Sequence, residues 1–231
     1  MKTCLITGVG PGTGAALVRR FAEDDYQVAM LARNAERLDE LAAEVPNTTA
    51  FACDVSDPAA LEKTYDDIKQ QLGAPTIIVH NAVGAERGTY MEIDPRRMQK
   101  AFEVNTLALL QLARMGTPDM LEAGGGAIIC TGNTSAYRGR ARFAGFAPTK
   151  AAQRILLESI AREAGPKGIH AAYVAIDAVI DVPWTREAFA GQPDDFFCQP
   201  ADIAEECYRI AHQPRSAWTF ESVIRPFGET W

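Results

Sequence analysis

The 231-residue sequence lacks the features of several large classes of protein. It has no excess of positive charge: the formal net charge is -7, which argues against a surface that binds nucleic acid or an anionic membrane. It has no apolar run of the roughly 18 residues that span a membrane, and residues 1–6 are too short for the apolar part of a signal peptide. We therefore expect a cytoplasmic protein without nucleic-acid or membrane partners.

The cysteines show no spacing typical of a disulfide framework or a metal site. They are odd in number, scattered and mostly embedded in apolar segments, without a Cys-x-x-Cys pair or His spacing that would hold a metal. We expect reduced core residues and no metal. The chain also lacks a Pro/Gly/Ser-rich linker and internal repeats, while 47% of its residues are hydrophobic, so we expect one domain over residues 1–231. The cysteines are Cys4, Cys53, Cys130, Cys198 and Cys207.

Short β-like runs alternate with stretches of helical periodicity. This alternation predicts right-handed βαβ units in an α/β fold, a doubly wound parallel sheet covered by helices on both faces. The long helical stretches are expected at 96–115, 149–164 and 202–212. The expected strands cover residues 4–6, 27–31, 49–53, 76–80, 127–131 and 169–175, with a candidate edge strand at 222–224.

A glycine-rich loop, Thr7-Gly8-Val9-Gly10-Pro11-Gly12-Thr13-Gly14, separates the first strand from the first helix. Glycines allow the backbone to turn tightly and approach a pyrophosphate, and the helix N-terminus offers unpaired N–H groups and a positive dipole end. The loop therefore predicts dinucleotide binding. Since ligands of such sheets lie beyond the carboxyl ends of the strands, Asp54, Asn81 and Asn133 are expected around the same crevice.

Further motifs follow the loop at spaced positions: Cys53-Asp54-Val55 after the third strand, Asn81-Ala82 after the fourth, Val104-Asn105-Thr106 in a helix, and Lys150 before Ala151-Ala152. Together with the loop, they resemble the short-chain dehydrogenase/reductase superfamily over nearly the whole chain. The resemblance implies a three-layer Rossmann fold and an oxidoreductase that uses NAD(P) on a small carbonyl or alcohol. It also implies a homodimer or homotetramer, formed through the helices that carry Asn105 and Lys150.

The resemblance implies a role for each matching residue. Lys150 would hold the nicotinamide ribose and place positive charge near the reacting oxygen, and a water anchored between Asn105 and Lys150 would deliver a proton. Asp54 would contact the adenine. The expected cofactor-binding residues are Thr7, Gly8, Gly12, Thr13, Gly14, Arg33, Asp54, Val55, Asn81, Ala82, Lys150 and Asp177.

The end of the second strand bears on the choice of cofactor. Relatives that use NAD commonly carry an acid there, whereas this chain has Ala32 followed by Arg33. A guanidinium pairs well with the 2′-phosphate of NADP, so we favour NADP(H) and keep NAD(H) as the alternative. Arg33 also fits a solvated charge at a helix entry, and Pro11 stands where many NADP-preferring relatives carry Arg or Lys.

The chemical centre departs from the family pattern. Phe146 stands four residues before Lys150, where the family has a proton-donating tyrosine, and a phenyl ring has no titratable proton. Asn133 aligns with the family's carbonyl-binding serine and can donate through its amide. A slip of one or two residues would instead place Thr134 or Ser135 there. We therefore take Lys150, Asn105, Asn133 and Phe146 as the positions that decide catalysis.

Other positions have two interpretations each. Asp177 replaces the glycine of the family's Pro-Gly turn, where it would accept a hydrogen bond from the carboxamide or cap the turn. Tyr90 and Tyr137 are substitute proton donors or ordinary packing tyrosines. The three histidines, His80, His170 and His212, receive no catalytic role. Among residues 182–200, an apolar lid is expected from Trp184, Phe189, Phe196 and Phe197.

Two functions therefore remain open. The first is an NADP-dependent oxidoreductase with an atypical active site and a small-molecule substrate. The second is a protein that binds NADP without catalysis and serves as a redox sensor or an assembly subunit.

Overall fold

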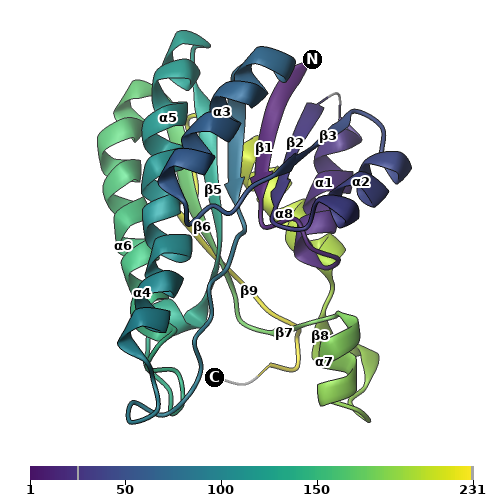
Figure 1. The fold of residues 1–231 in the computed structure, drawn as a ribbon, viewed down its shortest axis with the longest axis vertical. Helices are drawn as coiled ribbons and strands as arrows, with labels where there is room; N and C mark the ends of the chain where they lie inside the picture. Colours follow the sequence, from purple (N-terminus) through teal and green to yellow (C-terminus); the bar gives the residue numbers. More distant parts are fainter. Residues whose placement is uncertain (25, 230–231) are drawn as a thin grey trace.

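A seven-stranded parallel sheet with the order β3-β2-β1-β4-β5-β6-β9 forms the centre of the structure, a computed structural model that describes residues 1–24 and 26–229 (Figure 1). The sheet and its helices make one α/β domain with a Rossmann-like fold, as the sequence predicts. The edge strand at the carboxyl terminus is present and pairs in parallel with its neighbour. The strands are β1 (Lys2–Thr7), β2 (Tyr26–Ala32), β3 (Thr48–Ala52), β4 (Pro75–His80), β5 (Gly126–Asn133), β6 (Ile169–Ile176) and β9 (Glu221–Ile224).

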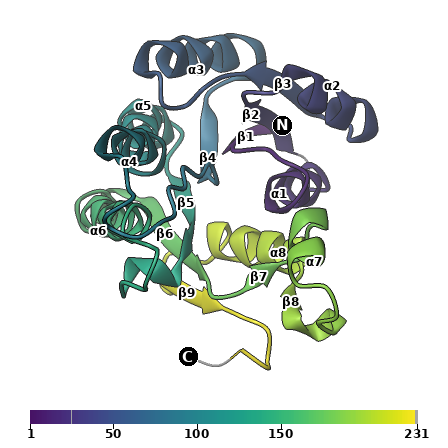
Figure 2. The ribbon, with the colours of Figure 1, turned by 60° about the horizontal axis from the view of Figure 1, so that its bottom comes forward.

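Helices cover both faces of this sheet (Figures 1 and 2). One face packs against α1 (Thr13–Ala22), α2 (Ala35–Glu44) and α8 (Pro200–Ala211), and the other against α3 (Pro58–Leu72), α5 (Ala108–Glu122) and α6 (Ala147–Ala164). Side chains of one strand alternate between the two cores, because successive residues of a strand point to opposite faces. In β1, for example, Cys4 and Ile6 enter one core and Leu5 the other.

The start of α1 has no side-chain cap, unlike the starts of α2 and α3. Asn34 accepts a hydrogen bond from the Arg37 N–H at 3.0 Å and so caps α2, and Asp57 caps α3 in the same way. At α1 the N-cap residue is Gly12, which offers no side-chain acceptor. The N–H groups of Ala15 and Ala16 bond to the carbonyls of Gly10 and Gly12, so among the described residues those of Thr13 and Gly14 are left for another partner, which an anion can supply.

The expected helix over 96–115 is interrupted. It consists of α4 (Pro95–Phe102), a π-helical turn η1 (Glu103–Leu107) and α5, and the turn contains the buried Asn105. Such turns are frequent at functional sites because they reposition one residue of a helix. The helix expected from residue 149 begins at Ala147. The remaining elements are β7 (Val179–Ile180), α7 (Pro183–Ala188), β8 (Phe197–Cys198), and the 3₁₀ turns η2 (Thr134–Ala136), η3 (Gly165–Lys167) and η4 (Asp194–Phe196).

The five cysteines are all buried free thiols, as expected for core residues. Within residues 1–24 and 26–229, no cluster of His, Cys, Asp and Glu side chains has a metal-binding arrangement. None of the helices in these ranges combines the length and the apolar character that a membrane crossing requires.

Candidate functional site

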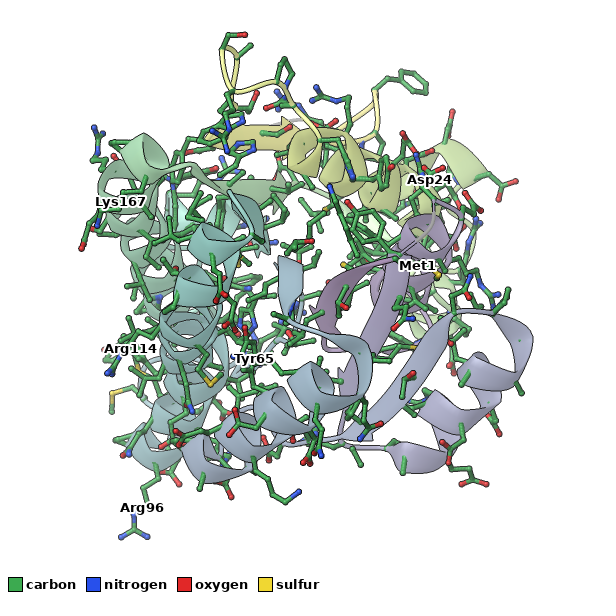
Figure 3. All side chains as sticks on the ribbon, turned by 90° about the horizontal axis from the view of Figure 1, so that it is seen from above. Met1, Asp24, Tyr65, Arg96, Arg114 and Lys167 are labelled. Atoms are coloured by element: carbon green, nitrogen blue, oxygen red, sulfur yellow. The ribbon has the colours of Figure 1, made fainter. Side chains whose placement is uncertain are left out.

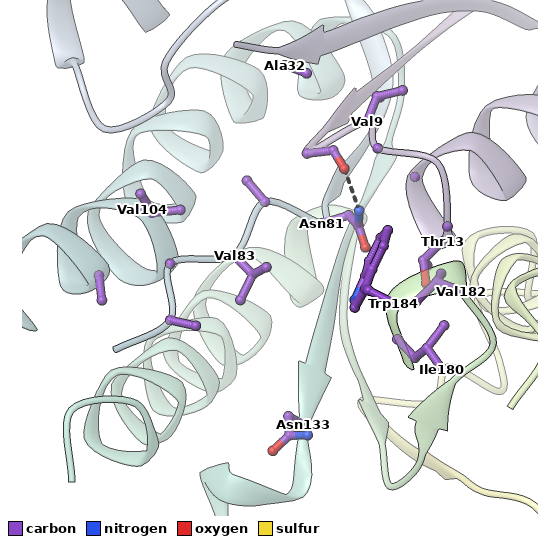
Figure 4. A pocket seen from close by; sticks show the side chains of 18 of the residues that line it. Val9, Thr13, Ala32, Asn81, Val83, Val104, Asn133, Ile180, Val182 and Trp184 are labelled. Carbon is purple, nitrogen blue, oxygen red and sulfur yellow. Dashed lines mark hydrogen bonds between the residues drawn. The ribbon is translucent and has the colours of Figure 1, made fainter. Parts of the chain in front are cut away.

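A cleft of about 1580 Å³ lies at the carboxyl ends of the strands, where the strand order reverses between β1 and β4. The segments that the sequence places around one crevice all line it: the loop from Gly8 to Gly14, then Asp54, Asn81 and Asn133 (Figure 4). Val55, Ala82 and Asp177 line it as well. This is the position at which open parallel sheets bind their ligands.

The glycine loop forms an anion cradle at one wall of this cleft. Gly8 has a φ of +70°, and a Cβ at this position would lie 2.5 Å from the Cα of Ala82, so only glycine fits. The hydroxyl oxygen of Thr13, the first residue of α1, is buried and has no hydrogen-bond partner in the described chain. An unpartnered hydroxyl beside an uncapped helix start fits the diphosphate of a dinucleotide.

Thr7 lies beneath the loop rather than in the lining, and its hydroxyl joins β1 to β4. The Thr7 oxygen accepts hydrogen bonds from the amides of Asn81 and Ala82 at 3.2 and 3.3 Å, so its proton goes to Nδ1 of His80, 3.0 Å away. Nε2 of His80 donates to the Val104 carbonyl at 3.1 Å. Burial, aided by the nearby Lys150 charge, lowers the pKa of His80 to about 4, which keeps this histidine neutral and structural.

Asn81 connects the glycine loop to β5. Its Nδ2 donates to the Gly8 carbonyl at 2.9 Å (Figure 4). Its Oδ1 accepts from the Thr131 hydroxyl at 2.9 Å. All the heteroatoms of this amide are therefore used within the protein. Asn81 shapes the cleft floor by holding two strand ends together.

Cationic and acidic side chains meet at the end of the cleft beyond β2 and β3. Arg33 and Arg37 line this end together with Asp54. Hydrogen bonds from Ser56 to Asp54 lower the pKa of this carboxyl group, and the charges of Lys100 and Arg33 lower it further. Arg33 therefore lies close enough to Asp54 to affect its charge, at the end where the adenosine half of a dinucleotide is expected.

Lys150 points into the protein interior and does not line the cleft. Only 3% of it is exposed, and its Nζ donates to Oε1 of Gln153 at 2.8 Å. Nε2 of Gln153 in turn donates to the Asn105 carbonyl at 2.7 Å. The Gln153 amide thus links Lys150 to Asn105 directly. Burial lowers the pKa of Lys150.

Sequence reasoning missed Gln153, although a signal was available. Residues three apart on a helix lie on the same face, and Gln153 follows Lys150 by three positions on α6. A buried glutamine at this spacing needs partners for both its amide oxygen and its nitrogen, and the lysine and a carbonyl supply them.

Two more of the four positions expected to decide catalysis, Asn105 and Phe146, also lie behind the cleft wall. The Asn105 side chain donates to the Gly84 carbonyl and the Thr149 hydroxyl, both at 2.8 Å, and is fully buried. Phe146 is buried as well, with its ring centroid 6.0 Å from Nζ of Lys150. The structure brings these residues together, but it presents none of them to the cleft.

The three candidates for contact with the substrate oxygen, Asn133, Thr134 and Ser135, all line the cleft. Oδ1 of Asn133 accepts from the Ser135 N–H at 2.8 Å and so caps the 3₁₀ turn η2. The Thr134 hydroxyl donates to Oδ1 of Asp177 at 2.6 Å. Oδ2 of Asp177 is buried without a hydrogen-bond partner in the described chain, although Nη1 of Arg225 lies 3.9 Å away.

The aromatic residues of the expected lid divide into two groups. Trp184 and Phe189 line the cleft, and Figure 4 shows Trp184 extending across it towards Asn81. Phe196 packs against Phe189 with a centroid distance of 5.6 Å, and Phe197 is buried in β8. Trp184 and Phe189 therefore face the cleft, while Phe196 packs behind Phe189.

The two tyrosines considered as substitute donors lie elsewhere. Tyr137 has the guanidinium of Arg154 at 5.4 Å from its ring, and burial followed by a hydrogen bond with Glu221 raises its pKa. Tyr90 is 80% exposed. Neither tyrosine is among the described residues that line the cleft.

Residues 2–192 match the family model described as short chain dehydrogenase. The chain belongs to this family. An oxidoreductase of Sarocladium schorii is 32% identical over 200 residues, which cover 86% of this chain and 80% of the relative. An uncharacterized short-chain type dehydrogenase/reductase of Sinorhizobium fredii is 31% identical over 177 residues, or 73% and 70% of the two chains.

Solved structures agree with this assignment. A short-chain dehydrogenase from Rhodopseudomonas palustris is 29% identical, with a TM-score of 0.84 over 98% of this chain and 99% of that one. An alcohol dehydrogenase from Thermococcus sibiricus, complexed with 5-hydroxy-NADP, has the same fold: its TM-score is 0.88 at 24% identity, over 100% and 98% of the two chains. This short-chain dehydrogenase is therefore an oxidoreductase by family, and the family implies a small-molecule substrate.

Proposed function

We propose that this protein is an NADP(H)-dependent oxidoreductase that acts on a small carbonyl or alcohol compound, with cofactor and substrate in the same cleft. The observation that carries the proposal is the cradle at the start of α1, where the buried Thr13 hydroxyl lacks a partner and the helix lacks a cap. Two structural neighbours, the Thermococcus sibiricus alcohol dehydrogenase and a metagenomic short-chain oxidoreductase, are described with 5-hydroxy-NADP and NADP respectively, which supports the choice of cofactor.

The cradle and the cationic end of the cleft would bind different parts of the cofactor. The loop from Gly8 to Gly14 would hold the diphosphate, and Asp54 and Val55 would lie beside the adenine. Arg33, with Arg37 nearby, would bind the 2′-phosphate through charge-assisted hydrogen bonds, and this contact favours NADP(H) over NAD(H).

When bound, the nicotinamide supplies or accepts a hydride. The protein would orient the substrate oxygen through the amide of Asn133 or the hydroxyl of Ser135 at the end of β5. Lys150 would contribute positive charge from behind the wall, held in place by Gln153. Phe146 cannot donate a proton, so the chain would forgo the roughly 10²- to 10⁴-fold gain that a general acid provides. Such an enzyme would be slow or would need an activated carbonyl.

Two measurements test the proposal. Calorimetry should detect NADPH and NADP⁺ binding to the purified protein, and a panel of aldehydes, ketones and quinones should then reveal oxidation of NADPH. The Lys150→Ala variant should lose the turnover. Failure of both oxidised and reduced nicotinamide cofactors to bind at millimolar concentration would refute the proposal.

A protein that binds NADP without catalysis is a second candidate. One observation favours it: the Lys150 amine is occupied by Gln153, and neither Lys150 nor Phe146 reaches the cleft. This candidate predicts tight NADPH binding, no turnover with any member of the panel, and new activity in a Phe146→Tyr variant.

We also propose a homodimer or homotetramer formed through α5 and α6. Leu107, Leu110 and Ile155 on this side of the molecule are large apolar residues that the single chain leaves exposed. Light scattering coupled to size exclusion should give a mass of two or four chains, and a monomer would refute this assembly.

A further inference from the structure

The half of the cleft beyond β4 and β5 has a wall built from two loops that hold each other in place. The Gly88 N–H donates to the Arg142 carbonyl at 3.0 Å, and Gly88 forms an isolated bridge with Phe143. Gly145 packs so tightly that a Cβ there would lie 2.9 Å from the Glu86 carbonyl oxygen. Side chains on these loops therefore have a defined arrangement relative to one another.

Guanidinium groups dominate this wall, although the chain as a whole has a net charge of -7. Arg87, Arg97 and Arg140 all line the cleft here. Glu86 is buried and pairs with Nε of Arg97 at 3.1 Å, so its charge is already compensated. Arg87 and Arg140 both lie near the ring of Phe143 instead, with guanidinium carbons 5.3 and 5.9 Å from its centroid.

The remaining carboxylates of the cleft do not neutralise this pair. Asp177 faces Arg225 at 3.9 Å, Asp54 lies at the opposite end with Arg33, and Glu229 comes from the carboxyl-terminal tail. Neither Arg87 nor Arg140 forms a salt bridge with any residue in the ranges that the structure describes. Two cations beside one aromatic ring therefore face the cleft without a salt-bridge partner among residues 1–24 and 26–229.

The cofactor's own phosphates are poor candidates for this partner. The 2′-phosphate is expected at Arg33, which follows β2, whereas Arg140 follows β5. Three strand spacings separate these two strand ends, or about 14 Å at about 4.8 Å per strand. The diphosphate is expected between them, at the start of α1.

We propose that Arg87 and Arg140 bind an anionic group of the substrate, a carboxylate on a flat apolar body that Phe143 contacts. The inference rests on the proposed function and names its substrate class: keto acids or hydroxy acids rather than neutral ketones or alcohols. Arginine suits this role because its planar fork matches a carboxylate, and the Phe143 ring beside the two guanidiniums offers an apolar surface next to the charge.

A matched pair of ligands tests the proposal by binding alone. The probes are 4-acetylbenzoate and its methyl ester, which share the ring and the ketone and differ in charge. Calorimetry, or quenching of tryptophan fluorescence through Trp184, gives their dissociation constants with and without saturating NADP⁺. The variants are Arg87→Ala and Arg140→Ala, and Arg96→Ala is the control, since Arg96 projects away from the body of the protein (Figure 3) and does not line the cleft.

The acid should bind at least tenfold more tightly than the ester to the cofactor-loaded protein. Each of the variants Arg87→Ala and Arg140→Ala should weaken the acid about tenfold and leave the ester unchanged, and Arg96→Ala should change neither. Equal binding of acid and ester, binding of neither, or a preference that survives both substitutions overturns the inference. The NADP⁺ titration reports separately on the proposed function, so the two can fail independently.

Discussion

Replacement of Arg33 by aspartate is the sharpest test of how the cleft chooses its cofactor. Arg33 directly precedes Asn34, which caps α2, so its position is defined by the helix start and not by a flexible loop. The exposed side chain lies at the end of the cleft and close enough to Asp54 to lower the pKa of that carboxyl group. The substitution removes a cation from the expected phosphate site and puts an anion in its place.

The size of the effect follows from two contributions. Loss of a charge-assisted hydrogen bond costs about 1.5 kcal/mol, the lower end of its range, because this end of the cleft is open to solvent. Repulsion between the new carboxylate and the 2′-phosphate adds about 1 kcal/mol for charges that remain well solvated. Together they correspond to roughly a 70-fold loss of NADPH affinity. NADH lacks the phosphate, and its ribose hydroxyls can donate to the new carboxylate, so its affinity should hold or rise.

Calorimetry with NADPH and NADH on the wild type, Arg33→Asp and a charge-matched Arg96→Asp control measures this effect. The ratio of the two dissociation constants should shift by about two orders of magnitude in Arg33→Asp and stay constant in the control. Raised salt should weaken NADPH more than NADH in the wild type. An unchanged ratio in Arg33→Asp, or an equal loss for both cofactors, would remove Arg33 from the phosphate site.

Three further predictions concern the interior behind the cleft. Phe146→Tyr should raise the turnover of NADPH with a carbonyl substrate by about 10²-fold or more, because the added hydroxyl extends from behind the cleft wall, and an unchanged steady-state rate would show that this hydroxyl does not reach the substrate oxygen. Gln153→Leu removes the Asn105 carbonyl's bond to Gln153 and leaves the buried Lys150 amine with only its 3.5 Å hydrogen bond to the Thr131 carbonyl, so urea denaturation should show a loss of about 2 to 4 kcal/mol; a smaller loss would argue against the relay. His80 has a folded pKa of about 4 against 6.5 when unfolded, so the unfolded state binds its proton first as the pH falls. Its contribution is complete above pH 6.5, and about 2.5 kcal/mol should be lost by pH 4.5; a His80→Gln variant that loses as much over this range would contradict the assignment.

The sequence by itself determined the sheet, most of the helices and the glycine loop, because these depend on local patterns. Short apolar runs bounded by turn residues indicate strands buried on both faces, and glycines between a strand and a helix indicate a tight turn there. The expected ring of Gly8, Asp54, Asn81 and Asn133 also needed no coordinates, since the carboxyl ends of parallel strands lie at one edge.

The tertiary structure decided which polar groups hydrogen-bond to one another within the protein and which remain available to a ligand. Only packing shows that Gln153 joins Lys150 to Asn105, or that Tyr137 faces Arg154 instead of the cleft. Hydrogen-bond partners and desolvation depend on groups far apart in the chain, and periodicity carries no information about them. The pairing of Arg87 with Arg140 beside one ring arises in the same way, from two loops more than fifty residues apart that meet only in the folded protein.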